Sequence, residues 1–187
     1  MFRKKWRPAA ESDTDTPRII KDPERARERT MNRAVKLLAA KPRSVGELRE
    51  RLLEKNWTNA EIVARVIEKL TEYNYLDDAK FAADLALSKL RQKPQGKRRL
   101  QQSLSQKKLS KEDVNAAIET AFEKLPETDL IDAAIAKRLR LKGRPETRAD
   151  TKKFYDHLMR QGFDFDLIRS KMNDVAKRED LDDEDNF

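Results

Sequence analysis

The sequence contains no cysteine, which excludes disulfide bonds and thiolate chemistry. Histidine occurs once, as His157, so the Cys and His clusters that hold zinc cannot form. The glycines Gly46, Gly96, Gly143 and Gly162 are too far apart for a phosphate-binding glycine loop. The lone histidine in a predicted helix is typical of an ordinary helix residue. We therefore expect no cofactor and no metal site, and the protein is predicted not to be an enzyme.

Long apolar runs are missing as well. No stretch approaches the ~20 consecutive apolar residues that are needed to cross a bilayer. The N-terminal stretch MFRKKWRPAAESDTDTP lacks the apolar segment of a secretory signal. These absences predict a protein that does not contact a membrane and that is cytoplasmic.

Charge is what the sequence has in abundance. Charged residues make up 41% of the 187 residues and hydrophobic residues 37%, with a net charge of +8. The last eleven residues, KREDLDDEDNF, hold six acids and two bases, and the rest of the chain holds 40 lysines and arginines against 28 acids. Such a basic body favours a polyanion or an acidic protein surface as its partner.

The sequence repeats one pattern three times, in segments 52–70, 104–122 and 158–176. Leu52, Leu104 and Leu158 align at offsets of 52 and 54 residues, without a gap. Apolar residues recur at helical spacing, and no long alternating run suggests a strand. We predict an all-α fold of three tandem three-helix repeats that form an elongated, curved array, with a flexible tail at each end.

The predicted boundaries follow from this pattern. The three repeats are predicted at 22–73, 74–125 and 126–177, between a flexible tail at 1–21 and an acidic tail at 178–187. Ser44 is predicted to open a second helix that carries Val45, Leu48 and Leu52. The other helices are predicted at 22–41, 59–73, 78–92, 96–107, 111–125, 128–142, 148–161 and 165–177.

Each copy carries the signals that begin a helix. Aligned side chains that accept hydrogen bonds from free N–H groups are the predicted N-caps, and they are Thr58, Ser110 and Asp164. In the first copy, Trp57 and Ile62 have the spacing of a hydrophobic staple, and Glu61 would complete a capping box with Thr58. Asn56 and Gly162 suit the left-handed end of the preceding helix, whereas Lys108 fits that conformation poorly.

The stretch NYLDDAKFA, residues 74–82, contains two adjacent aspartates that could be a catalytic or metal-binding pair. Leu76 and Phe81 again have the staple spacing if Asp77 caps a helix. Asp78 would then lie in the first turn, where the helix dipole favours negative charge. No further ligand or acid–base partner lies nearby in the sequence. These aspartates are therefore predicted to begin a helix.

The strongest functional signal is a basic segment from Leu85 to Ser110. It has no acid in 26 residues, and its eight cations are the candidate partner-binding or DNA-binding surface: Lys89, Arg91, Lys93, Lys97, Arg98, Arg99, Lys107 and Lys108. A second basic stretch spans 136–153. With Leu100 and Leu104 directed to the core, Arg98, Arg99 and Gln102 would face outward. The alternative interpretation is an ordinary solvated helix face.

Two motifs together resemble the RecX regulatory proteins of bacteria. They are N-Y-L-D-D-x-x-F-A, here with Tyr75-Leu76-Asp77-Asp78 and Phe81-Ala82, and G-x-x-R-[IL]-x-x-x-L-x-x-K, here with Gly96, Arg99, Leu100, Leu104 and Lys107. The resemblance covers about residues 30–176. Asn74 replaces a usual glycine, Lys108-Leu109 stands where Gly-Ile is common, and Pro94 and Gln95 replace a Tyr-Gly type of linker.

The resemblance implies a non-enzymatic modulator of the RecA recombinase, with a role in homologous recombination, DNA repair and the SOS response. Such proteins lodge in the groove of the RecA–DNA filament and typically inhibit it. The expected partners are the RecA filament on DNA and, weakly, single- or double-stranded DNA, and the absence of a heptad seam predicts a monomer. Two alternatives stay open: a general basic helical nucleic-acid-binding module without a recombinase partner, and a purely structural helical scaffold.

Overall fold

The computed structural model describes the backbone of residues 19–184 and the side chains of residues 19–174. Within that range it contains nine helices and no strand, which confirms the all-α prediction. The helices are α1 (Pro23–Ala40), α2 (Val45–Leu53), α3 (Ala60–Glu72), α4 (Asp78–Gln92), α5 (Lys97–Ser105), α6 (Lys111–Lys124), α7 (Glu127–Lys142), α8 (Arg148–Arg160) and α9 (Phe165–Glu184). None of these helices is long and apolar enough to cross a membrane.

The two predicted tails fall at the edges of the described range. Most of the tail predicted at 1–21 lies outside the described residues, as do residues 185–187. Helix α9 continues to Glu184, beyond its predicted end at 177, so part of the acidic segment is helical.

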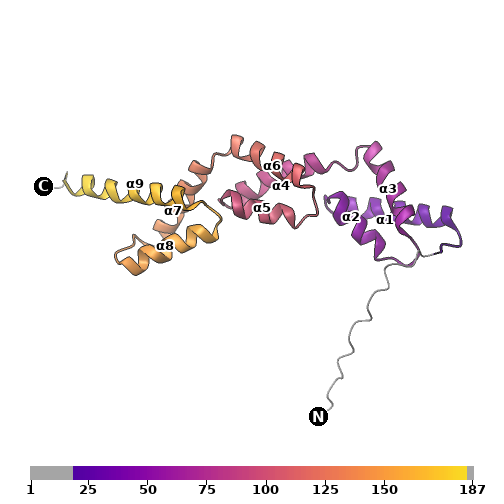
Figure 1. The fold of residues 1–187 in the computed structure, drawn as a ribbon, viewed down its shortest axis with the longest axis horizontal. Helices are drawn as coiled ribbons and strands as arrows, with labels where there is room; N and C mark the ends of the chain where they lie inside the picture. The colour runs from indigo at the N-terminus through magenta and orange to yellow at the C-terminus, as the bar shows by residue number, and fades with distance from the viewer. Residues whose placement is uncertain (1–18, 185–187) are drawn as a thin grey trace, which may run out of the picture.

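Consecutive helices pack together in threes, as α1–α3, α4–α6 and α7–α9, which we call units 1, 2 and 3. Figure 1 shows the three units placed side by side along the long axis, with α1–α3 at one end and α7–α9 at the other. The result is an elongated helical array.

Apolar stripes at helical spacing form the core. In α3, for example, Ile62, Val66 and Leu70 are buried, while Glu61 and Arg65 form an exposed ion pair of 2.7 Å on the opposite side. Unit 1 has its own hydrophobic cluster, whereas units 2 and 3 share one continuous cluster that runs from Ala82 to Met172. Units 2 and 3 are therefore fused by apolar packing, and unit 1 is attached by other means.

Local signals placed most helix starts correctly. Asp77 caps α4, where its carboxylate accepts the Lys80 N–H at 2.8 Å, and Ser110 caps α6 by accepting the Asp113 N–H at 2.9 Å. Asp164 precedes α9, and its carboxylate accepts the Asp166 N–H at 2.9 Å. The helix-start interpretation of Asp77 is therefore confirmed.

The predicted cap of α3 is wrong. The cap is Asn59, whose side chain accepts the Ile62 N–H at 2.9 Å, and α3 begins at Ala60. Thr58 is buried instead and accepts a hydrogen bond from the Thr30 hydroxyl at 3.0 Å, so the capping box with Glu61 is also wrong. An asparagine caps a helix as well as a threonine does, and burial of Thr58 against α1 decides which of the two neighbours is used.

The left-handed positions also differ in part from the prediction. Among the described non-glycine residues, only Asn74 (φ 58°) and Lys108 (φ 55°) have a positive φ, so the prediction for Asn56 is wrong. Gly162 has φ 89°, as predicted. Lysine is a poor residue for this conformation. The contacts between units 1 and 2, described below, hold Lys108 in it.

Candidate functional site

Six of the eight predicted cations lie between the last turns of α4 and the first turn of α5, and we call them the basic surface: Lys89, Arg91, Lys93, Lys97, Arg98 and Arg99. Lys89 is half-buried and the other five are exposed. None of the six forms an ion pair with any carboxylate in residues 19–174. Their charge is therefore not neutralised by the described part of the protein.

The first turn of α5 is unusual for a helix start. Helix N-termini favour acids because the N–H groups carry partial positive charge. The other eight described helices all have an acid in the first turn, but α5 begins with three cations, Lys97, Arg98 and Arg99, and no acid. Its N-cap, Gly96, supplies no side-chain cap either. Residues that contradict a local stability preference, as these cations do at a helix start, are often found at functional sites.

Groups from unit 3 accept hydrogen bonds from the free N–H groups at the start of α5. The Lys97 N–H donates to the Glu127 carboxylate at 2.9 Å, and the Gly96 N–H donates to the Gln161 carbonyl at 3.0 Å. The Arg98 N–H donates to the carbonyl of Gly162 at 3.3 Å. Unit 3 thus supplies the acceptors that the lysine and arginine side chains of this turn, which carry only donors, cannot supply.

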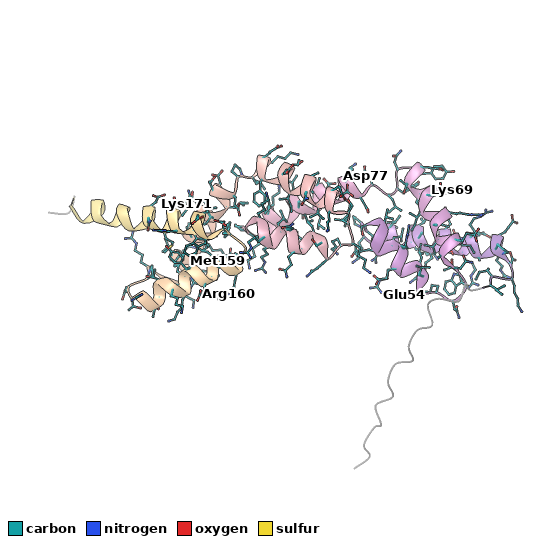
Figure 2. The ribbon with its side chains drawn as sticks, viewed as in Figure 1. Glu54, Lys69, Asp77, Met159, Arg160 and Lys171 are labelled. Carbon is teal, nitrogen blue, oxygen red and sulfur yellow. The ribbon has the colours of Figure 1, made fainter. Side chains whose placement is uncertain are left out.

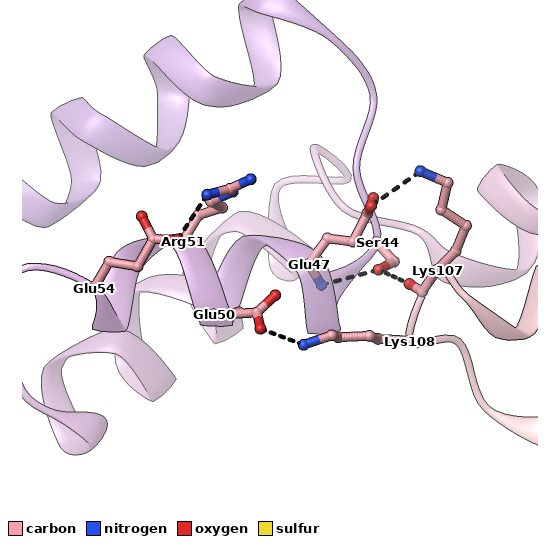
Figure 3. A network of polar contacts seen from close by, with 7 residues as sticks. All are labelled: Ser44, Glu47, Glu50, Arg51, Glu54, Lys107 and Lys108. Carbon is pink, nitrogen blue, oxygen red and sulfur yellow. Dashed lines mark hydrogen bonds and ion pairs between the residues drawn. The ribbon is translucent and has the colours of Figure 1, made fainter. Parts of the chain in front are cut away.

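The remaining two cations, Lys107 and Lys108, have a different role. Their ammonium groups lie 3.0 Å from Glu47 and 2.6 Å from Glu50, both on α2, as Figure 3 shows. These ion pairs join unit 2 to unit 1. The Lys108 ammonium is also the main reason that the pKa of the Glu50 carboxyl is lowered, through a hydrogen bond and its charge.

The same joint contains contacts that the sequence analysis missed. The Ser44 hydroxyl donates to the Lys107 carbonyl, and the Val45 N–H donates to the Asp78 carboxylate at 2.8 Å. Asp78 thus satisfies the N-terminus of α2, in a different unit, besides lying in the first turn of α4. Burial raises the pKa of Asp78, and the hydrogen bond from Val45 opposes that rise. Among the described residues, no group of three potential ligands could hold a metal ion.

A polar groove of about 930 Å³ runs between α5 and α8. Arg98 and Arg99 line it from α5, and Arg160 and Asp156 line it from α8, so cations outnumber carboxylates. Arg99 donates from its guanidinium to the Arg160 carbonyl at 3.0 Å, and Figure 2 shows Arg160 on α8. The predicted outward direction of Arg98 and Arg99 is confirmed, and the groove places them together with a third arginine from another unit.

His157 lies close to this groove on α8. Its Nε2 is 2.6 Å from the side-chain nitrogen of Gln161. Burial lowers the pKa of His157, and the charges of Arg138, Arg160 and Lys93 lower it further. Both the burial and the positive surroundings thus favour the neutral imidazole, and Lys93 of the basic surface contributes to that positive field.

A second groove, of about 690 Å³, lies at the joint of units 1 and 2 and is mainly apolar. Tyr75 and Val35 line it and are 69% and 48% exposed, so its wall is open to a partner. Lys41, Arg43 and Lys80 are among its cationic lining residues, and its carboxylates are Asp77 and Asp84. The sequence alone does not reveal this groove, because residues from α1, α3, α4 and the turns between them form it only after folding.

Comparison with known proteins agrees with this architecture. Residues 31–70 match the first three-helix domain of RecX, and residues 77–118 match its second three-helix domain. The chain is 33% identical over 147 residues to "Regulatory protein RecX" of Prosthecochloris aestuarii, covering 79% of this chain and 93% of that one. It is 31% identical over 150 residues to the protein of the same name from Chlorobaculum tepidum, covering 80% and 89%.

Two solved structures share the fold. The crystal structure of RecX from Lactobacillus salivarius superposes with a TM-score of 0.72 at 17% identity, covering 82% of this chain and 98% of that chain. A second crystal structure, of a regulatory protein RecX, gives a TM-score of 0.67 at 21% identity and covers 79% and 71%. Both show the arrangement of helices that is seen here.

Proposed function

Since the chain belongs to the RecX family of regulatory proteins, we propose that it modulates the RecA recombinase, with inhibition as its main effect, by binding in the groove of the RecA–DNA filament. The observation that carries this proposal is the first turn of α5, where Lys97, Arg98 and Arg99 occupy positions that favour acids. Such a turn is maintained for a ligand that bears negative charge.

The proposed DNA-facing part is the basic surface together with the α5–α8 groove. Its cations form no ion pairs within residues 19–174. A phosphate backbone can therefore pair with these cations without breaking an existing ion pair. Arg98, Arg99 and Arg160 reach it from two helices of different units. The joined core of units 2 and 3 holds these helices in a fixed relation, which suits a regular polyanion.

The proposed recombinase-facing part is the apolar groove between units 1 and 2. Tyr75 and Val35 are exposed in this groove, and covering them with apolar side chains of a partner would lower the free energy. A phosphate backbone does not supply such side chains. The cations Lys41, Arg43 and Lys80 at the same groove fit an acidic segment of protein. We assign this groove to an acidic, partly apolar surface of the recombinase.

Titration of the protein into RecA on single-stranded DNA tests the proposal. We expect DNA-dependent ATP hydrolysis and strand exchange to fall at amounts of protein below one per recombinase subunit. The double variant Arg98→Glu/Arg99→Glu should lose this effect and keep the helical circular dichroism spectrum. A matched control is Lys36→Glu/Arg49→Glu, which makes the same change of charge at exposed positions of unit 1.

Three results would contradict the proposal. Unchanged ATP hydrolysis and strand exchange at physiological salt would exclude modulation of RecA. Equal loss in the α5 variant and in the control would show that only net charge matters. Affinity for bare DNA as high as for the filament, with log K falling by ~0.7 per phosphate contact against log salt on single strands, would instead favour a general nucleic-acid-binding module.

A further inference from the structure

The face between α8 and α9 in unit 3 presents an aromatic pair to the solvent. The rings of Tyr155 on α8 and Phe165 on α9 have centroids 6.1 Å apart and are tilted by 47°. Tyr155 packs partly against the core, whereas Phe165 is 51% exposed. An apolar ring that is half-exposed beside a second ring is an available stacking surface.

Cations lie on both sides of this pair. Arg148 and Lys152 precede Tyr155 on α8 at spacings that place them on one helix face, and Arg169 follows Phe165 by one turn of α9. All three cations are exposed, and none forms an ion pair with a carboxylate of residues 19–174.

These cations and rings line one shallow groove, in which Asp156 is the single carboxylate among the residues whose side chains the structure describes. Asp156 also lines the α5–α8 groove, so the two grooves border the same helix and meet at this residue. Because a carboxylate stands where the grooves meet, phosphates are favoured at the cations on either side of this point and not at the point itself.

We propose that the α8–α9 face of unit 3 binds unpaired bases of single-stranded nucleic acid, with one base stacked on Phe165 and Tyr155 and the adjacent phosphates at Arg148, Lys152 and Arg169. Flat aromatic rings within a positively charged groove are how proteins hold single strands without reading their sequence. The bases of a duplex are already stacked on each other and cannot reach the rings. This site goes beyond the proposed function, because it needs only a bare strand and no recombinase.

The test measures binding of a labelled oligothymidylate of about 20 nucleotides by fluorescence anisotropy, since single-strand sites cover roughly 4–16 nucleotides. We expect Phe165→Ala to weaken binding by about fivefold to about a hundredfold, as for the loss of one stacked base. Phe165→Trp should bind like the unchanged protein, and its indole fluorescence should be quenched by the strand. Deoxy and ribo strands serve as parallel arms, and a duplex of the same length should show no dependence on residue 165.

Two controls separate stacking from a structural effect. Tyr73→Ala removes another exposed ring beside a cation, 5.6 Å from the Lys69 ammonium but in unit 1, and should leave binding unchanged. A strand of the same length without bases should bind the unchanged protein and Phe165→Ala equally well. Circular dichroism and the thermal midpoint show whether the variant is folded.

The proposal is wrong if folded Phe165→Ala binds oligothymidylate as well as the unchanged protein does. It is also wrong if Phe165→Ala weakens binding of the strand without bases as much as it weakens binding of oligothymidylate, since the ring would then only shape the groove. Loss of binding to the recombinase filament with unchanged binding to the bare strand would assign the face to protein contact and overturn it as well. Failure of the RecA titration leaves the measurements on bare strands and on the duplex interpretable, because those contain no RecA.

Discussion

Replacement of Gly96 by alanine tests how units 2 and 3 are joined. Gly96 lies where α5 begins against the turn that follows α8. A Cβ atom at this position would meet the carbonyl carbon and oxygen of Gly162 and the nitrogen of Phe163, all at 2.3 Å. These three atoms belong to the backbone, so no side-chain rotation relieves the contact. The units must move apart.

The cost can be worked out from the contacts that this movement breaks. The hydrogen bonds from Gly96 to Gln161 and from Arg98 to Gly162 would lengthen, at about 1 kcal/mol each. Overpacking adds about 1–3 kcal/mol. The free energy of unfolding should thus fall by roughly 3–5 kcal/mol, which for a chain of this size lowers the thermal midpoint by roughly 10 °C.

Differential scanning calorimetry measures the effect, with Gly143→Ala as its matched control. A Cβ atom at Gly143 meets nothing within 4 Å, so that variant carries only the strain of alanine at φ 73° and ψ −178°, a conformation almost confined to glycine, about 1–3 kcal/mol. We expect Gly96→Ala to melt clearly below Gly143→Ala. If Gly96→Ala melts at or above the control, the close backbone contact between units 2 and 3 is not what holds them in place.

Three further predictions concern the joint between units 1 and 2 and the histidine. Lys108→Glu should broaden the distances between labels placed on these two units in a fluorescence-transfer experiment, and adding Glu50→Lys should restore them; no rescue would refute the ion pair. Asp78→Ala should lower the free energy of unfolding by about 1–2 kcal/mol, since the partly buried Val45 N–H loses its acceptor. Asp78→Asn keeps an acceptor and should cost less, and urea denaturation of the two variants checks this ranking. The single imidazole, His157, should titrate below its ordinary pKa of 6.5 in an NMR experiment. As the pH falls, the unfolded chain then binds a proton at His157 before the folded protein does. The contribution of His157 to stability is therefore present above pH 6.5 and is lost as the pH falls below 6.5. A pKa of His157 at or above 6.5 in the folded protein contradicts this prediction.

Local signals in the sequence predicted the helices well because each depends on a few adjacent residues. Asp77 and Ser110 cap α4 and α6 as predicted, since a short polar side chain before an apolar stripe has few other uses. The error at Thr58 shows the limit of such signals. Asn59 beside it caps equally well, and only contact with α1 settles which side chain turns inward.

The site was predicted less completely, because its partners come together only in the fold. The exposure of Arg98 and Arg99 follows from the helix period, but their proximity to Arg160 depends on how unit 3 packs. Lys107 and Lys108 look the same in sequence as the other cations and differ by their ion pairs with α2.

A preference for the assembled nucleoprotein over its separate components is the central property that we propose for this protein. The most direct measurement compares the affinity of the protein for bare single-stranded DNA, for RecA without DNA and for the assembled filament, at one physiological salt concentration. We predict that the filament binds much more tightly than either component and that Arg98→Glu/Arg99→Glu removes most of the difference. Equal affinity for the filament and for bare DNA, or a difference that the variant leaves intact, would contradict the account.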